Sequence, residues 1–228
     1  MTKQTNRFLT LWISALAALG LSLSGFAQDD VTPLDVVIGA IDDSKTGLAE
    51  NRQTYLDDES ALIEWVDSLL APRFDRNYAG RLVLARHWRG ASNEQKRRFI
   101  RGFYNAMLSR YATGILEFQE DRLKILPQRG ESKENRATIS TEVTLDDGSA
   151  VVVEYRMVKR GDAGWQVFDV SIDGISYIRN FRAEIDSEIK KTSLDAVIER
   201  LESEAKLVDE TACCDRPSRP VRKRVVSR

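Results

Sequence analysis

The sequence has few of the residues that form disulfides and metal sites. Its 228 residues include two cysteines, the adjacent Cys213 and Cys214, and one histidine, His87. Neighbouring cysteines form a strained bridge and lack the C-x-x-C spacing of a metal site, so we expect no disulfide framework. A disulfide between two copies of the chain in an oxidising compartment is the alternative. Since one imidazole leaves no second for a metal cluster, we expect no metal and no other cofactor.

Motifs for hydrolysis and for nucleotide binding are also missing. The chain contains neither a G-x-S-x-G elbow nor a glycine-rich phosphate loop. The candidate general bases are Glu154 and Asp169, two carboxylates that interrupt apolar strand patterns. A carboxylate inside the apolar run Val167–Ile172 must be hydrogen-bonded, so Asp169 is expected to tie its strand to a neighbouring turn or helix. A general base in a cone-shaped, isomerase-like pocket is the alternative.

A long hydrophobic run occurs only at the N-terminus. Lys3 and Arg7 precede this run, and the small residues Gly25 and Ala27 follow it. This order is typical of a secretory signal peptide, which we place at residues 1–27, with cleavage near Ala27 and release outside the cytoplasmic membrane. A retained anchor is the alternative, but a spanning helix needs about 20 apolar residues. The cut has no nearby cysteine that would accept a lipid anchor.

Positive charge is concentrated at the C-terminus. The whole chain has 34 basic and 35 acidic residues, but residues 215–228 contain six basic residues and one acidic residue. The domain at residues 28–206 is therefore acidic, and we expect no nucleic-acid partner. We predict a basic, disordered tail at residues 207–228, with binding of that tail to anionic lipid or to an acidic partner as the alternative.

The first half of the chain has the spacing of helices. Capping signals begin helices at Thr32 and Ser92, and a further helical pattern ends before Pro72. The helix after Ser92 is the longest, and its apolar face is wide enough to contact apolar material on two sides. The residues that recur every four positions on that face are Phe99, Phe103, Met107, Tyr111 and Ile115.

From Asp121 the apolar period changes to two, which is typical of β-strands. Turn sequences at Asp146–Gly148 and Gly161–Gly164 separate successive strands and predict an antiparallel meander. Helical patterns return after Gly174 and end near Lys206. We therefore predict an α+β fold in which helices pack on a curved antiparallel sheet of about four strands.

The third predicted strand presents an apolar face. Val151, Val153, Tyr155 and Met157 alternate along it and point to one side of the sheet. Together with the aromatic and methionine side chains of the long helix, they either line one cavity or fill a dry core. Composition leaves both interpretations open.

Two stretches carry more specific motifs, Arg73–Ala112 and Gly164–Arg182, and the second contains W-Q-V-F-D-V followed by G-I-S and N-F-R. Both resemble the MlaC family, also called toluene-tolerance or periplasmic phospholipid-binding proteins, over most of the mature chain. The sequence departs from the family pattern in three places, none of which removes an apolar wall: Phe168 for tyrosine, Asp173 for glutamate and Arg86 for glycine.

The resemblance implies a soluble carrier that moves glycerophospholipids between the inner and outer membranes, maintains outer-membrane lipid asymmetry and catalyses nothing. It also implies two partners, an inner-membrane ABC transporter complex with an MCE-domain protein and an outer-membrane lipoprotein–porin complex.

The physics of such a task requires an enclosed apolar cavity. Two acyl chains hold about 30 methylenes, and at about 0.8 kcal/mol each their exposure to water costs more than about 20 kcal/mol. The residues predicted to line an acyl-chain cavity are Phe99, Phe103, Met107, Tyr111, Val151, Val153, Tyr155 and Met157.

Overall fold

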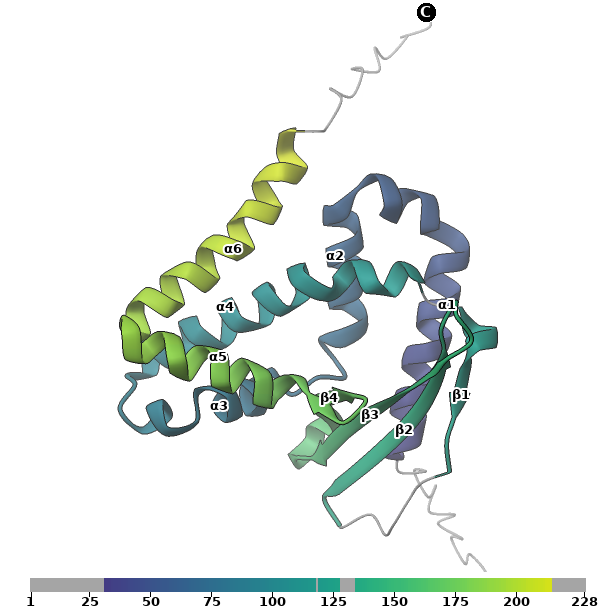
Figure 1. Ribbon diagram of the computed structural model, residues 1–228, viewed down its shortest axis with the longest axis horizontal. Coiled ribbons are helices and arrows are strands. Elements are labelled where there is room, and N and C mark those ends of the chain that lie inside the picture. The colour runs from purple at the N-terminus through teal and green to yellow at the C-terminus, as the bar shows by residue number, and fades with distance from the viewer. Residues whose placement is uncertain (1–30, 118, 128–133, 215–228) are drawn as a thin grey trace, which may run out of the picture. The chain divides into compact units, whose positions relative to one another are not determined.

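The computed structural model describes residues 31–117, 119–127 and 134–214 (Figure 1). The predicted signal peptide and residues 215–228 of the predicted tail lie outside this part of the chain. None of the helices in the described ranges is both long and apolar enough to cross a membrane.

Helices make up the first half of the described chain. Their bounds are Pro33–Asp57 (α1), Glu59–Leu70 (α2), Arg76–Leu84 (α3) and Asn93–Tyr111 (α4), with short 3-10 helices at Ala85–Arg89 (η1), Ala112–Glu117 (η2) and Glu120–Arg122 (η3). α1 begins at a capping box, because the Thr32 hydroxyl accepts from the Asp35 N–H at 3.2 Å and the Asp35 carboxylate accepts from the Thr32 N–H at 2.8 Å. The capping box of Ser92 and Gln95 that begins α4 confirms the sequence prediction.

The second half begins with an antiparallel sheet in the order β1-β2-β3-β4-β5. The strands are Leu123–Ile125 (β1), Arg136–Thr144 (β2), Ala150–Lys159 (β3), Trp165–Ile172 (β4) and Ile175–Ser176 (β5), and the 3-10 helix Gly161–Ala163 (η4) joins β3 to β4. The chain reverses through Gly148 and Gly164, whose φ values of 80° and 68° favour glycine. The short β5 was not predicted from the sequence, because two residues after a turn carry no measurable period.

A bulge interrupts the pairing of β3 with β4. Arg156 pairs with Asp169, but Met157 pairs with Val167, so Phe168 is the extra residue on β4. Phe168 and Asp169 are consequently both buried, although consecutive residues of a regular strand face opposite sides of the sheet.

The chain ends in helices Tyr177–Lys191 (α5) and Leu194–Cys214 (α6). α6 continues to Cys214 and does not end near Lys206 as expected. α6 packs closely on α4 because Gly102 has no side chain; a Cβ there would lie 3.1 Å from Cβ of Leu201.

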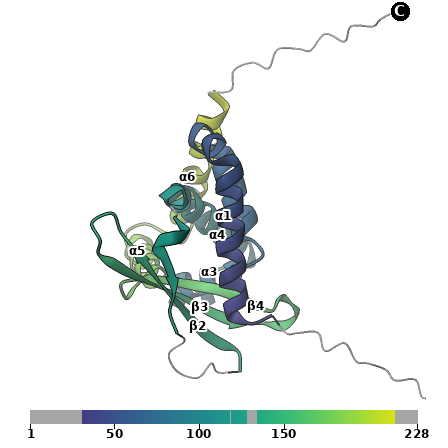
Figure 2. The same ribbon diagram turned by 90° about the vertical axis from the view of Figure 1, so that its right-hand side faces the viewer.

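The helices gather on one side of the sheet in both views (Figures 1 and 2). The first turns of α1 touch β2 and β4, while α3 and α5 touch β4. The central α4 contacts α2, α3 and α6. This arrangement confirms the predicted α+β class, with helices packed on an antiparallel sheet that has five strands.

Candidate functional site

A cavity of about 500 Å³ lies between the helices and the sheet. Its walls come from the first half of α1, the end of α2, the second half of α4, η2, the strands β1, β3 and β4 and the beginning of α5. Nearly all of the lining side chains are apolar or aromatic. The cavity therefore has the character of hydrocarbon and not of an aqueous cleft.

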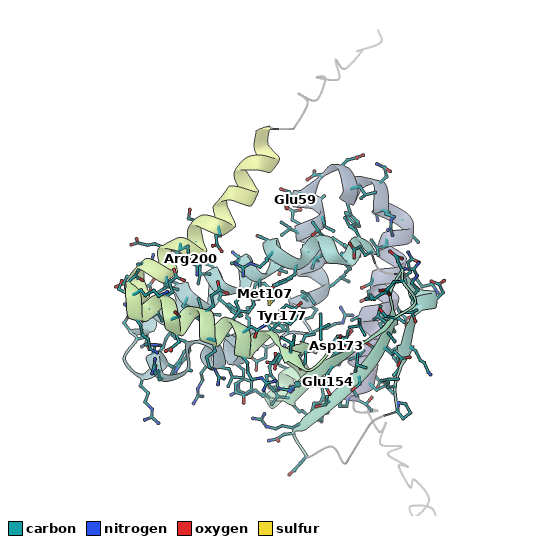
Figure 3. All side chains as sticks on the ribbon, viewed as in Figure 1. Glu59, Met107, Glu154, Asp173, Tyr177 and Arg200 are labelled. Carbon is teal, nitrogen blue, oxygen red and sulfur yellow. The ribbon has the colours of Figure 1, made fainter. Side chains whose placement is uncertain are left out.

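Helix α4 contributes a wall because Phe103, Met107 and Tyr111 repeat every four residues on the side that faces the cavity. Figure 3 shows Met107 and Tyr177 in the space between α4 and α5. The two helices meet through aromatic rings: Phe103 contacts Phe181 edge to face with centroids 5.2 Å apart, and Tyr111 contacts Tyr177 at 5.0 Å. These pairs fix the position of α4 relative to α5 at the cavity wall.

The sheet contributes Tyr155 from β3 and Val167, Val170 and Ile172 from β4. The Tyr155 phenol lies 3.5 Å from the Thr141 hydroxyl, and burial raises the pKa of Tyr155, so this side of the cavity stays neutral.

The charged groups in the wall already have partners within the protein. Arg73 donates to the carbonyl oxygen of Leu69 at 2.9 Å and forms an ion pair with Asp43. The Ser44 hydroxyl, also at the wall, donates to the Ala40 carbonyl at 2.7 Å. These contacts give Arg73 and Ser44 partners within the protein, so neither needs a ligand.

Asp169 is likewise engaged, although it touches the cavity. Its Oδ2 accepts from the Ser176 hydroxyl at 2.7 Å and from Arg156 at 3.2 Å, and its Oδ1 accepts from the backbone N–H of Ile178 at 3.1 Å. The predicted tie between the strand and the next helix is thereby confirmed. A carboxylate with three donors has little capacity left to act as a base.

Comparison with known proteins identifies the family of this chain. The family model for the MlaC protein matches residues 39–203. The chain belongs to the MlaC family.

Two relatives agree with this membership. The toluene tolerance protein ttg2D of Pseudomonas putida is 24% identical over 165 residues, which cover 72% of this chain and 76% of that protein. The intermembrane phospholipid transport system binding protein MlaC of Haemophilus influenzae is 21% identical over 204 residues, which cover 89% and 94%.

A solved structure shares the fold. The phospholipid-binding protein from Ralstonia solanacearum, solved in complex with a phospholipid, is 20% identical, with a TM-score of 0.68 over 79% of this chain and 99% of that chain.

In this MlaC-family chain, the eight residues predicted to bind acyl chains divide into three groups. Phe103, Met107, Tyr111 and Tyr155 line the cavity. Phe99 and Met157 are fully buried in the core, Phe99 beside Phe103 and Met157 in a cluster with Val37 and Ile139. Val151 and Val153 are half-buried near the start of β3, outside the lining. A shared period along the chain thus does not place every residue at the cavity.

Other wall residues were not singled out from the sequence. Helix α1 presents Val36, Ala40 and Ile41, and α5 presents Tyr177 and Phe181. Their four-residue spacing was a usable signal, but period alone does not say which helix face covers the sheet.

His87 is part of a surface ion-pair cluster and does not line the cavity. Its Nε2 lies 2.8 Å from Oδ1 of Asp186, which also pairs with Arg86 and, at 2.9 Å, with Lys190. Across the described residues, no group of three or more His, Cys, Asp or Glu side chains is placed to hold a metal ion.

Proposed function

We propose that the protein is a periplasmic phospholipid carrier that moves glycerophospholipids between the inner and outer membranes with their acyl chains in the cavity. The observation that carries this proposal is an apolar cavity whose charged wall groups, Arg73 and Asp169, are already paired within the protein, in a chain of the MlaC family. The printed names of its relatives, a phospholipid transport binding protein and a protein solved with a phospholipid, support the same ligand.

The size of the cavity sets how much lipid it holds. At about 500 Å³ the cavity lies within the range of roughly 300–1,000 Å³ that is typical of ligand pockets. Each methylene buried in it is worth about 0.8 kcal/mol.

We propose binding without catalysis. The alternative of an isomerase-like enzyme needs Asp169 as a free general base, whereas that carboxylate accepts three hydrogen bonds from Ser176, Arg156 and Ile178. Its contacts join β4 to α5 and support a structural role.

The place of work and the partners of the carrier also belong to this proposal. Removal of the signal peptide near Ala27 would release the chain into the periplasm. Family membership supports docking to an inner-membrane ABC transporter complex with an MCE-domain protein and to an outer-membrane lipoprotein–porin complex.

The test is whether phospholipid remains bound to the protein when the protein is purified from the cell envelope. We expect native mass spectrometry of protein purified from a bacterial periplasm without detergent to show the chain with bound phospholipid, and solvent extraction to recover that lipid in near-stoichiometric amount. A spectrum that contains only the bare chain would count against a carrier.

A further inference from the structure

Two tyrosines meet where the cavity reaches the protein surface. Tyr111 is the last residue of α4 and Tyr177 the first residue of α5, and their rings pack edge to face with centroids 5.0 Å apart. Both line the cavity, and Tyr111 is 41% exposed to solvent. Figure 3 shows Tyr177 between α4 and α5.

The hydroxyl groups of this pair are free to bind a ligand. Within the described part of the chain, neither phenol oxygen has a hydrogen-bond partner, in contrast to Tyr104, which donates to Asp67 at 2.7 Å. Burial and the neighbouring Tyr111 phenol raise the pKa of Tyr177, so the Tyr177 hydroxyl keeps its proton and can donate it in a hydrogen bond.

An arginine with weak ion pairs lies beside them. The Arg110 guanidinium lies 5.6 Å from the ring centroid of Phe181, and this ring also contacts Tyr111. Its nearest carboxylate contacts, to Glu184 and Glu204, are 3.8 and 3.9 Å long, which is beyond hydrogen-bond length. The N–H groups of Arg110 are therefore available for an anion.

We propose that the hydroxyls of Tyr111 and Tyr177 and the guanidinium of Arg110 bind the phosphate diester of a glycerophospholipid whose acyl chains occupy the cavity. This inference rests on the proposed function. A phosphate offers acceptor oxygens and a negative charge, which suit two hydroxyl donors and a guanidinium. Arg73, the arginine that lines the cavity itself, is already committed to Asp43 and to the Leu69 carbonyl.

The experiment compares ligands with and without the phosphate. Tyr111→Phe combined with Tyr177→Phe keeps both rings and removes both hydroxyls, and Arg110→Gln removes the charge. With delipidated protein, we expect each variant to bind phosphatidylglycerol about tenfold more weakly, since each loses hydrogen bonds to a charged group. Their affinity for diacylglycerol with the same chains should not change.

Matched controls remove the same groups away from the rim. Tyr55→Phe removes a phenol on α1 that stacks on Trp65, and Arg101→Gln removes a charge on α4 with a 3.7 Å ion pair to Glu202. Neither residue lines the cavity, and neither control should weaken phosphatidylglycerol binding.

Each result has one meaning. Unchanged phosphatidylglycerol affinity in the rim variants, or an equal loss for diacylglycerol, overturns the phosphate site. Inorganic phosphate should not compete with lipid; competition that depends on Tyr111 and Tyr177 would assign the site to free phosphate instead. Wild-type protein that binds neither lipid would contradict the carrier function, and with it the phosphate site that rests on that function.

Discussion

The Ser176 hydroxyl donates a 2.7 Å hydrogen bond to Oδ2 of Asp169, and this contact joins β4 to the beginning of α5. The N–H of Ile178 donates to the other carboxylate oxygen at 3.1 Å, and Arg156 adds a charged donor at 3.2 Å. Because α5 places Tyr177 on the cavity wall, one buried carboxylate fixes that wall against the sheet.

Removal of this carboxylate should weaken the whole domain. Asp169→Ala leaves the Ile178 N–H and the Ser176 hydroxyl buried without an acceptor, so we expect the free energy of unfolding to fall by about 3 kcal/mol. In Asp169→Asn the free energy of unfolding should fall by less, because the amide oxygen still accepts a hydrogen bond. Urea unfolding followed by circular dichroism measures both variants.

The control is Asp162→Ala, which removes an exposed carboxylate from the turn before β4. It should leave the free energy of unfolding within about 0.5 kcal/mol of wild type. Equal stability of Asp169→Ala and Asp162→Ala would mean that Asp169 does not hold α5 in place.

Filling the cavity should remove the lipid without unfolding the protein. Met107 lies at the wall between α4 and α5, and Met107→Trp places an indole in the space intended for an acyl chain. We expect co-purified phospholipid, measured by phosphorus assay, to fall about tenfold.

Leu56→Trp is the matched control for this variant. Leu56 is 57% exposed on α1 and does not line the cavity, so its replacement should not change the lipid content. Full lipid content in Met107→Trp would show that the acyl chains lie elsewhere.

The elements with strong local signals were predicted correctly. The capping box at Ser92 and the four-residue spacing up to Tyr111 define α4, and the period of two with its glycine turns defines β2 to β4. The role of Asp169 also followed from the sequence, because a buried carboxylate requires donors. In each case the signal lies within about 20 neighbouring residues.

The cavity itself was harder to predict, because it depends on where two elements fail to touch. Phe99 and Phe103 share one period on α4, but Phe99 is buried in the core whereas Phe103 reaches the cavity. Close packing at Gly102 brings α6 against α4 in this region. The sequence near Phe99 does not indicate that α6, about a hundred residues further along the chain, packs against this part of α4.

Asp186 provides a prediction about pH. Hydrogen bonds from Lys190, His87 and Arg86, in that order of effect, hold the pKa of this carboxyl well below its usual value. A lowered folded-state pKa gives stability that is present above the unfolded pKa of about 3.9 and is lost as the pH falls further. We expect Asp186→Asn to have a lower melting temperature than wild type at pH 6, and the difference to shrink steadily below about pH 4.

Melting curves between about pH 2.5 and pH 6 measure this difference. Asp162→Asn is the control, because the structure gives this exposed carboxylate no partner among the described residues. A difference between Asp186→Asn and wild type that stays constant as the pH falls would mean that the carboxylate is not engaged by Lys190, His87 and Arg86.

Gly47 lies where α1 meets α2. A Cβ at this position would lie 2.5 Å from Nε1 of Trp65, closer than side-chain atoms approach. The Trp65 indole cannot easily move aside, because it stacks on Tyr55 with ring centroids 4.6 Å apart and planes at 12°. Both helices supply walls of the cavity, so their close approach also shapes the site.

This contact reverses the usual effect of alanine in a helix. Alanine stabilises a helix interior by about 1 kcal/mol relative to glycine, but Gly47→Ala must displace Trp65, and overpacking of this kind costs about 1–3 kcal/mol. We therefore expect a net loss of unfolding free energy in urea, with a change in the tryptophan fluorescence of the folded state. Gly114→Ala is the matched control, since a Cβ there meets no atom within 4 Å and should not destabilise the fold. If Gly47→Ala were the more stable variant, α1 and α2 would not pack through the Trp65 ring.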